Sequence, residues 1–309
     1  MKICLVTGST GFIGKRLVHR LLKDKIIVYG VSRNLNYNFS SKNYFHIKCD
    51  LLKSEIPKKI LEKVDTIFHL AGYAHDTRRS QSFENIHKSL TLNASLKLAR
   101  RSKKKSVRNF IYISTSKAGN IGENERGQNI LVNEIDREKI YGFYKRETEI
   151  RLLKIFNNSK INFSIIRPSL VYGPNLKGNL GLMFKAIKWG VFPPIPSIKN
   201  KKSLIHVDDL IEAILLINRT QKSKQKIYIV SDGKYYSTYQ IYKIFCNILN
   251  RKIPNWSIPI SIFNFLKLNQ YTRNKIQKLF EDDFYDTSQL TELGFKPKLN
   301  LKKIYEKNF

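Results

Sequence analysis

The feature that most constrains the fold is a glycine-rich loop near the beginning of the chain. An apolar run at 2–6, KICLV, leads directly into TGSTGFIG at 7–14, and an amphipathic helical pattern follows from Ile13 to Lys23. Glycines at this spacing between a strand and a helix permit a tight turn, close approach of the backbone to a pyrophosphate, and close packing of the helix. The loop therefore predicts a dinucleotide-binding unit rather than a merely flexible turn. Its candidate cofactor contacts are Gly8, Thr10, Gly11, Phe12, Ile13 and Gly14.

Short β-rich runs continue to alternate with helical patterns through the first half of the chain. The expected strands lie at 26–31, 44–49, 66–71, 110–115 and 163–168, and the clearest helices at 82–102 and 141–157. Alternation of this kind predicts a parallel sheet that is covered by helices on both faces. The predicted fold class is α/β, a doubly wound Rossmann sheet.

After Pro168 the sequence changes, because glycine, proline and asparagine interrupt short apolar pieces. We expect a dinucleotide-binding domain over 1–168, to which the chain returns around 203–230, and a smaller α+β substrate lobe built mainly from 169–309. In this second half, helices are expected at 207–218 and 237–249, the latter opened by Ser237 or Thr238, and a strand at 226–230. An exposed apolar helix at 258–270 is expected to pack onto the smaller lobe in preference to a membrane or a partner.

The chain is strongly basic, with 56 Lys and Arg against 24 Asp and Glu and a formal charge of +32. Such a charge suggests nucleic acid or an anionic membrane surface. The basic residues are spread along the whole length, however, and no nucleic-acid-binding motif accompanies the local runs at 103–108 and 199–202. We therefore predict no nucleic-acid partner and keep weak association with an anionic membrane as an open alternative.

Several classes of protein are disfavoured by the remaining composition. No apolar run is long enough to span a bilayer, and the chain enters a strand at once without room for a signal peptide, which predicts a cytoplasmic protein. Cys4, Cys49 and Cys246 are far apart and are expected to be buried free thiols. The six histidines form no ligand pattern, so we predict no metal.

The ends of the second and third expected strands bear on the choice of cofactor. Where an NAD-selective site would place a carboxylate for the adenosine ribose, the chain has Ser32 and Arg33. A guanidinium there suits a 2′-phosphate, but it can equally stack on adenine, so NAD and NADP both remain open. Asp50, followed by Leu51, offers a carboxylate for the adenine amino group.

A second motif, YGFYK at 141–145, indicates the chemistry. On a helix, Tyr141 and Lys145 share one face, where the ammonium can lower the pKa of the phenol. The strand before this helix ends in Ser114, Thr115 and Ser116, at the carboxyl edge of the sheet where such folds bind ligands. A phenol to accept the alcohol proton, an ammonium beside it and a hydroxyl to hold the substrate oxygen are what hydride transfer at a carbinol needs.

With these motifs the chain resembles the extended short-chain dehydrogenase/reductases that act on nucleotide sugars, the NAD-dependent epimerase/dehydratase family. The resemblance covers nearly the whole chain. It rests on TGSTGFIG (7–14), CDL (49–51), FHLAGYAH (68–75), YISTSK (112–117), YGFYKRETE (141–149), RPSLVYGP (167–174), SLIHVDDL (203–210) and DTSQLTELGFKP (286–297).

The resemblance implies a role for individual positions. Thr115 matches the position of the catalytic hydroxyl, and Ser116 is the alternative. Tyr141 matches the acid/base. Lys145 matches the residue that lowers the pKa of this tyrosine and binds the ribose. The other implied cofactor contacts are Ser32, Arg33, Asp50, Leu51, Leu70, Ala71, Gly72 and Pro168. The implied substrate contacts are Ser114, Ser116, Ser169, Asn179, Leu180 and Lys202. A homodimer through the helices at 82–102 and 141–157 is a further implication.

The leading functional hypothesis is a 4-epimerase acting on a UDP-hexose or UDP-N-acetylhexosamine. Residues 177–210 resemble the subgroup that handles UDP-N-acetylhexosamines, whose members include 4-epimerases and reductases of 4-keto sugars. The first alternative is an NAD(P)H-dependent reductase of a 4-keto nucleotide sugar, and a nonenzymatic dinucleotide-binding subunit is the second. A dehydratase is disfavoured because Thr115 is followed by Ser116 and Lys117 instead of an acid pair. Two departures from the family bear on the substrate: Thr91 stands where asparagine is common, and the family's C-terminal arginine is not evident between Arg273 and Asp286.

Overall fold

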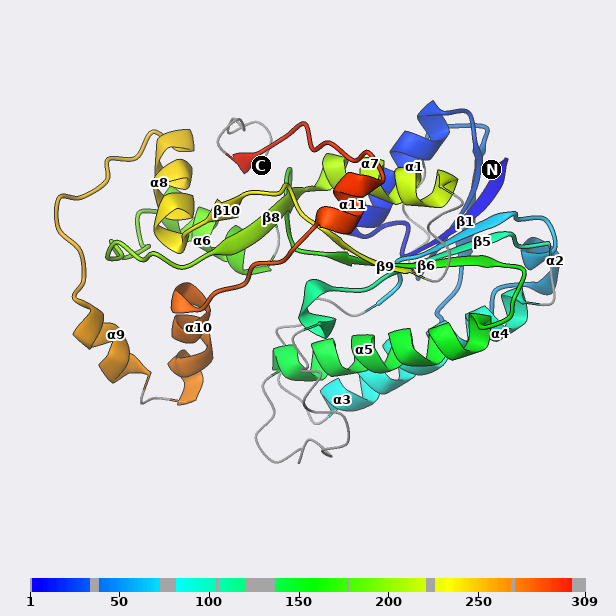
Figure 1. The fold of residues 1–309 in the computed structure, drawn as a ribbon, viewed down its shortest axis with the longest axis horizontal. Helices are drawn as coiled ribbons and strands as arrows, with labels where there is room; N and C mark the ends of the chain where they lie inside the picture. Colours follow the sequence, from blue (N-terminus) through cyan, green and yellow to red (C-terminus); the bar gives the residue numbers. More distant parts are fainter. Residues whose placement is uncertain are drawn as a thin grey trace. The chain divides into compact units, whose positions relative to one another are not determined.

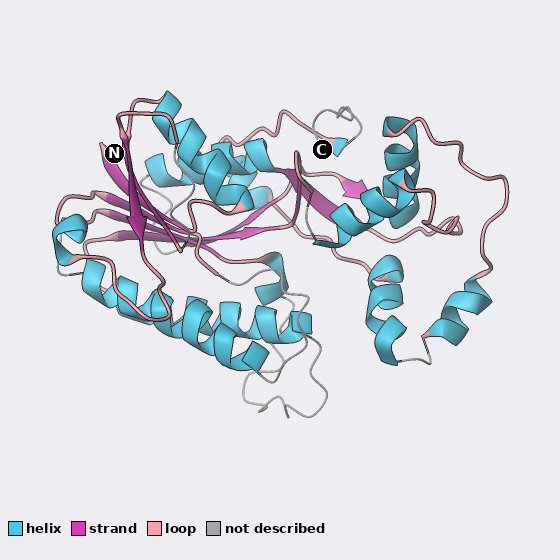
Figure 2. Cartoon of the chain, turned by 180° about the vertical axis from the view of Figure 1, so that it is seen from behind, coloured by secondary structure: helices cyan, strands magenta, loops and turns pink. Residues whose placement is uncertain are grey.

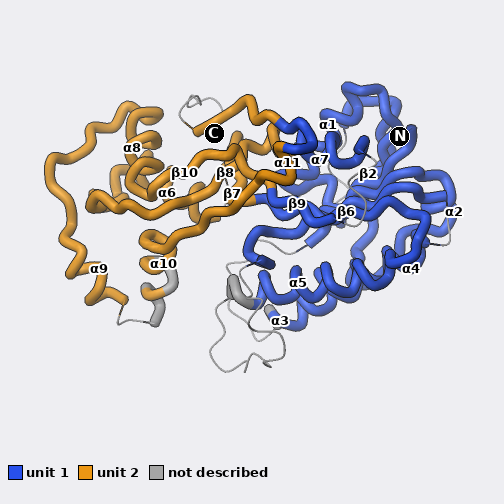
Figure 3. The backbone as a smooth tube through the Cα atoms, in the orientation of Figure 1, with its two compact units in different colours: residues 1–168, 211–229, 292–295 blue, residues 169–210, 230–291, 296–309 orange. Residues whose placement is uncertain are grey.

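The glycine loop connects the first strand, β1 (Ile3–Thr7), to the first helix, α1 (Phe12–Lys23), as the sequence predicts. The computed structural model describes residues 2–33, 39–72, 82–103, 106–119, 137–176, 178–220, 226–267 and 270–301. The chain divides into two units, which are coloured separately in Figure 3. Unit 1 comprises residues 1–168, 211–229 and 292–295, and unit 2 comprises 169–210, 230–291 and 296–309.

Unit 1 is built on a seven-stranded sheet in the order β3-β2-β1-β4-β5-β6-β9 (Figure 1). The further strands are β2 (Ile27–Ser32), β3 (Tyr44–Lys48), β4 (Thr66–His69), β5 (Asn109–Ile113), β6 (Asn162–Pro168) and β9 (Lys226–Val230). The pairs from β3 through to β6 are all parallel. The strand order reverses between β1 and β4, so the carboxyl ends of these two strands form the switch point at which ligands bind in open α/β sheets.

Helices cover both faces of this sheet, as Figures 1 and 2 both show. On one face lie α1 and the unit 1 part of α7 (Val207–Arg219). On the other, α5 (Arg137–Phe156) packs beside a helical stretch formed by α3 (Ser82–Ile86), a π-helical segment (His87–Asn93) and α4 (Ala94–Ser102). The short α2 (Lys58–Leu61) precedes β4. The predicted doubly wound α/β fold is therefore confirmed.

The core of unit 1 explains why the predicted strands form. Leu5, Ile67, Phe110 and Phe163, from β1, β4, β5 and β6, are completely buried in one cluster of apolar side chains. Because these strands are buried on both faces, they read as continuous apolar runs and not as alternating patterns. All three cysteines are buried free thiols, and burial raises the pKa of the Cys4 thiol well above its usual value.

Unit 2 combines a small mixed sheet with short helices. The sheet has the order β10-β8-β7, with β7 (Leu170–Tyr172) parallel and β10 (Tyr235–Tyr236) antiparallel to β8 (Lys202–His206). The helices are α6 (Gly178–Lys188), α8 (Thr238–Ile248), α9 (Ile260–Leu266), α10 (Gln270–Phe280) and α11 (Ser288–Glu292). A capping box decides where α8 begins: the Ser237 side chain accepts from the Gln240 N–H, and the Gln240 side chain accepts from the Ser237 N–H.

The apolar helix expected at 258–270 is α9, and it packs onto unit 2 less than we predicted. Phe263 is buried in the core of unit 2, whereas four other large apolar side chains of α9 remain exposed. These are Ile260, Ile262, Phe265 and Leu266. Within the described ranges, no helix has the length and hydrophobicity of a membrane-spanning segment.

Candidate active site

The glycine loop has the packing that a pyrophosphate cradle needs. Gly8 has a φ of +68°, which side chains with a Cβ rarely adopt, and an added Cβ would lie 3.0 Å from the Ala71 nitrogen. An added Cβ on Gly14 would lie 2.1 Å from the Gly8 carbonyl oxygen, so only glycine lets α1 pack on the loop so closely. The Gly11 N–H donates to the Gly8 carbonyl at 2.9 Å and closes the turn. A dinucleotide phosphate fits this helix N-terminus, where no side chain competes with it at the N-cap.

A buried polar network fixes the two strand ends beneath the loop. The Thr7 hydroxyl accepts from the N–H groups of Leu70 and Ala71 at 3.2 and 3.1 Å and pairs with the Nδ1 of His69 at 2.7 Å. The Nε2 of His69 pairs with the Ser95 hydroxyl at 2.8 Å. Burial lowers the pKa of His69 to about 3, so its ring stays neutral and bridges two hydroxyls. The sequence analysis missed this role, although a histidine at the end of a buried strand needs polar partners.

The adenosine end of the predicted site lies at the ends of β2 and β3. The Ser32 hydroxyl pairs with the Nε2 of His46 at 2.8 Å, and Arg33 is exposed. The Asp50 carboxylate accepts from the Leu52 N–H at 3.1 Å, which orients it just after β3. Neither residue 32 nor residue 33 is a carboxylate, so the end of β2 has no acidic side chain that would exclude the 2′-phosphate of NADP.

The predicted hydroxyl and phenol meet at the end of β5. Thr115 begins a short 3-10 helix (Ser116–Ala118), and its hydroxyl accepts from the Lys117 N–H at 3.3 Å. The same side chain interacts with Tyr141 of α5, and this interaction lowers the phenol pKa. Burial acts in the opposite direction and is the larger effect, so the pKa of Tyr141 is raised to about 12. The resting site therefore holds a protonated phenol.

Lys145 lies one turn farther along α5 and is almost completely buried. Its Nζ donates to the Ile113 carbonyl at 2.7 Å and lies 4.6 Å from the centre of the Tyr112 ring. Burial lowers its pKa to about 7, while the negative charge of Glu149 partly offsets that effect. An added Cβ on Gly72 would lie 3.3 Å from this nitrogen. The lysine is thus placed where the ends of β4 and β5 converge on α5.

The Ser114 hydroxyl is a buried polar group that still needs a partner. It lies directly before Thr115, and its Oγ makes no hydrogen bond within the part of the chain that the structure describes. Buried hydroxyls are nearly always satisfied, which makes this one a candidate for contact with a bound molecule. Ser116, the alternative hydroxyl, is also buried.

The π-helical segment opposite α5 contains Thr91, where the family commonly has asparagine. The Thr91 carbonyl accepts hydrogen bonds from the hydroxyls of Ser95 and Thr148, at 2.5 and 3.2 Å. In the same segment the His87 ring lies edge-on to the Tyr141 ring, with 5.7 Å between centroids. Burial and the nearby Lys145 lower the pKa of His87 to about 4, so the His87 ring is neutral, as the His69 ring is.

The remaining predicted contacts are distributed between the units. Pro168 ends β6 in unit 1, where Leu51, Leu70 and Ala71 also lie. The predicted substrate contacts Ser169, Asn179, Leu180 and Lys202 belong to unit 2. Ser169 is buried, and its hydroxyl has no hydrogen-bond partner among the described residues. On α6, Asn179 is exposed and Leu180 is part of the core; Lys202 begins β8 opposite Tyr236. Their contact with a substrate stays a prediction.

Comparisons with known proteins identify the family of this chain. A model of the NAD dependent epimerase/dehydratase family matches residues 4–231. The chain belongs to this family. It is 27% identical over 312 residues to the UDP-glucose 4-epimerase of Vibrio cholerae, covering 99% of this chain and 94% of that protein.

Two solved structures of the same fold are similar over almost their full lengths. The UDP-N-acetylglucosamine 4-epimerase of Methanobrevibacter ruminantium, in complex with UDP-N-acetylmuramic acid, is 21% identical with a TM-score of 0.73, covering 98% of this chain and 96% of that one. The UDP-glucuronic acid 4-epimerase of Bacillus cereus, in complex with UDP-glucuronic acid and NAD, is 19% identical with a TM-score of 0.72, covering 97% and 95%. At these identities the likeness establishes the fold.

Proposed function

We propose that this protein is an NAD-dependent 4-epimerase of a UDP-hexose or UDP-N-acetylhexosamine. The observation that carries the proposal is the convergence of Thr115 on the Tyr141 phenol, whose pKa it lowers, one helical turn from the buried Lys145. Epimerase chemistry is favoured over other hydride transfers because the relatives compared above are 4-epimerases of UDP-sugars.

In this proposal the glycine loop and Lys145 would hold the dinucleotide, whose nicotinamide would supply a reversible hydride acceptor for C4 of the sugar. The chain handles the proton. The Tyr141 phenol exchanges a proton with the C4 hydroxyl oxygen, while Thr115 holds that oxygen and Ser114 supplies a second hydroxyl beside it. The reaction has no net redox change, so it needs no second redox substrate.

Lys145 makes this proton transfer feasible near neutral pH. A phenol with a pKa of about 12 is a poor base at pH 7. A protonated Lys145 on the same helix face would favour the phenolate form of Tyr141. The Ile113 carbonyl and the Tyr112 ring hold the Lys145 nitrogen in place. The positive charge of an oxidised nicotinamide would act in the same direction.

The alternative is a one-way reductase of a 4-keto nucleotide sugar with NADPH, which Ser32 and Arg33 favour because they place no carboxylate against a 2′-phosphate. A homodimer through the helical stretch at 82–102, which comprises α3, the π-helical segment and α4, and through α5 belongs to the same proposal. Its support is the family resemblance.

The test is proton NMR of the purified protein with UDP-N-acetylglucosamine and UDP-glucose, each with catalytic NAD and no other redox reagent. Anomeric signals of the C4 epimer are expected for at least one sugar, and Tyr141→Phe should abolish them. Without such signals, NADPH oxidation by a 4-keto nucleotide sugar would identify a reductase instead. If the folded protein binds NAD but does neither, the nonenzymatic alternative is favoured.

A further inference from the structure

Unit 2 carries an exposed apolar surface that the proposed reaction does not use. Two segments form it: the chain following α6, and the connection from α8 into α9. Hydrogen bonds join these segments at two points, from Arg251 Nη2 to the Lys188 carbonyl at 2.6 Å and from the Ile258 N–H to the Pro194 carbonyl at 2.9 Å. We define the apolar patch as the exposed large side chains of these segments, Trp189, Val191, Trp256, Ile260, Ile262, Phe265 and Leu266.

The degree of exposure in the apolar patch is unusual for a folded protein. Phe265 is 72% exposed, Trp189 71%, Val191 70% and Trp256 65%. Single exposed apolar residues are common, but several large ones on neighbouring segments indicate an interaction site. The patch also contains both of the chain's tryptophans.

The two stretches of sequence that contain the apolar patch carry charge of one sign. No aspartate or glutamate occurs from residue 150 to 207 or from 233 to 280, the two stretches of sequence that contain every patch residue. Those stretches supply the basic residues nearest to the patch along the chain, which are Lys185, Lys188, Arg251, Lys252, Lys267 and Arg273. A surface with this composition attracts a partner that is both anionic and apolar.

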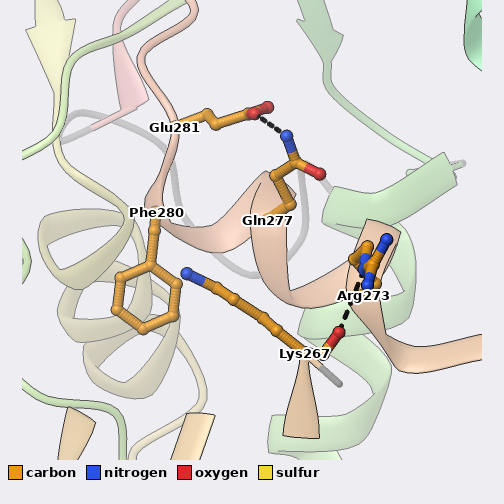
Figure 4. A pocket seen from close by; sticks show the side chains of 5 residues that line it. All are labelled: Lys267, Arg273, Gln277, Phe280 and Glu281. Carbon is orange, nitrogen blue, oxygen red and sulfur yellow. Dashed lines mark hydrogen bonds between the residues drawn. The ribbon is translucent and has the colours of Figure 1, made fainter. Parts of the chain in front are cut away.

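A shallow hollow of about 520 Å³ lies directly after the exposed end of α9, and Figure 4 shows its lining. The Lys267 Nζ lies 5.0 Å from the centre of the Phe280 ring, and the Arg273 Nε donates to the Lys267 carbonyl at 3.1 Å. The one carboxylate in the lining, that of Glu281, accepts from the Gln277 side-chain amide. The hollow therefore places an ammonium and a guanidinium beside the apolar patch.

We propose that the apolar patch of unit 2 docks on an anionic phospholipid membrane. Tryptophan and phenylalanine side chains insert at the boundary between head groups and acyl chains, and the surrounding Lys and Arg contact lipid phosphates. A second copy of the chain fits less well, because joining two such surfaces would bring together mainly basic groups, with Glu281 the one carboxylate in the lining of the hollow. This inference goes beyond the proposed reaction and does not depend on it.

The two tryptophans supply a direct readout, since their fluorescence shifts to shorter wavelength when they leave water. We expect such a shift when the full chain is mixed with vesicles of equal parts phosphatidylcholine and phosphatidylglycerol, and quenching when the vesicles contain brominated acyl chains. Vesicles of phosphatidylcholine alone should give at most a small shift. Raising NaCl from about 0.1 M to about 1 M shortens the screening length from about 10 Å to about 3 Å and should weaken binding.

Matched variants test whether the apolar patch is the part of the chain that contacts the membrane. Phe265→Ser should weaken vesicle binding at least tenfold, as measured by cosedimentation, and Leu266→Ser should weaken it less. Leu52→Ser is the control, because Leu52 is 40% exposed, as Leu266 is, but lies in unit 1. Circular dichroism should show that all three variants remain folded.

Either of two results would overturn the proposal. One is unchanged tryptophan emission with the anionic vesicles, and the other is an equal loss of binding in Leu52→Ser and Phe265→Ser. Self-association that buries both tryptophans without lipid, detected by sedimentation velocity, would assign the patch to a second copy instead.

Discussion

Arg167 donates two hydrogen bonds to the Glu149 carboxylate, from Nε at 2.9 Å and from Nη2 at 2.5 Å, and Glu149 is completely buried. The pair joins α5, which bears Tyr141 and Lys145, to β6. The Arg167 guanidinium also packs against Gly119, where an added Cβ would lie 2.9 Å from Nη1, just after the 3-10 helix that follows Thr115. One ion pair thus holds together three elements of the candidate site.

Replacing Glu149 by Gln should destabilise unit 1 severely, because a buried guanidinium then loses its counter-charge. Breaking one partner of a buried pair costs about 3–5 kcal/mol. The matched control is Glu147→Gln on the same helix, since Glu147 pairs with the exposed Arg151 at 3.1 Å and such pairs contribute about 0–1 kcal/mol. Urea unfolding of the three proteins measures both effects. Similar midpoints for the two variants would contradict the structural role of the buried pair.

Tyr141→Phe should lower kcat of the epimerisation by about 10²–10⁴-fold, because it removes the group that exchanges the proton. The fold and NAD binding should change little, since the ring stays in place. Tyr144→Phe is the control, because the Tyr144 hydroxyl donates only to Glu84, at 2.9 Å, in the described contacts. NMR progress curves and NAD titration measure both quantities. Comparable activity of the two variants would remove Tyr141 from the proposed mechanism.

The sheet could be predicted because its strands are buried on both faces and therefore appear as uninterrupted apolar runs. Most predicted strands agree with the observed ones to within one or two residues, as the third does at Tyr44–Lys48. The strands of unit 2 could not be found in this way, because β7 and β10 contain three and two residues, too few to show any periodicity.

The contacts around the candidate site depend on distant parts of the chain. The π-helical segment at Thr91 involves a hydrogen bond from Thr148, and the Glu149 pair requires the register of α5 against β6. The spacing of residues within a motif reveals neither of these long-range contacts. The spacing did place Tyr141 and Lys145 on one face of a helix, because residues four apart lie on the same face of any α-helix. Likewise, the apolar helix at 258–270 was recognised, but which of its side chains would be buried depended on unit 2 as a whole.

Lys145→Met should stabilise the cofactor-free protein while abolishing activity. Burial lowers the pKa of Lys145 to about 7, against an ordinary value of 10.5, so the fold penalises the protonated form. The penalty is complete below pH 7 and disappears as pH rises from about 7 to 10.5, where the unfolded chain binds more protons than the folded one. The melting temperature of the variant should therefore exceed that of the unaltered protein by at least about 2 °C at pH 6, and the gap should narrow towards pH 10. Lys154→Met, an exposed position on α5, should show no such pH-dependent gap. A gap that is constant with pH would contradict the lowered pKa.

The glycine loop predicts different effects for two neighbouring substitutions. Gly14→Ala forces a Cβ to within 2.1 Å of the Gly8 carbonyl oxygen and should cost about 1–3 kcal/mol of stability in addition to weakening NAD binding. Gly11→Ala meets the same oxygen at 3.1 Å, which a small shift can relieve, so it should stay nearly as stable as the unaltered protein. Its methyl group nevertheless stands where the backbone must approach the pyrophosphate, and NAD affinity should fall at least tenfold. Thermal melting without cofactor and NAD titration separate the two effects. A folded Gly11→Ala protein that binds NAD normally would show that the loop does not hold the pyrophosphate.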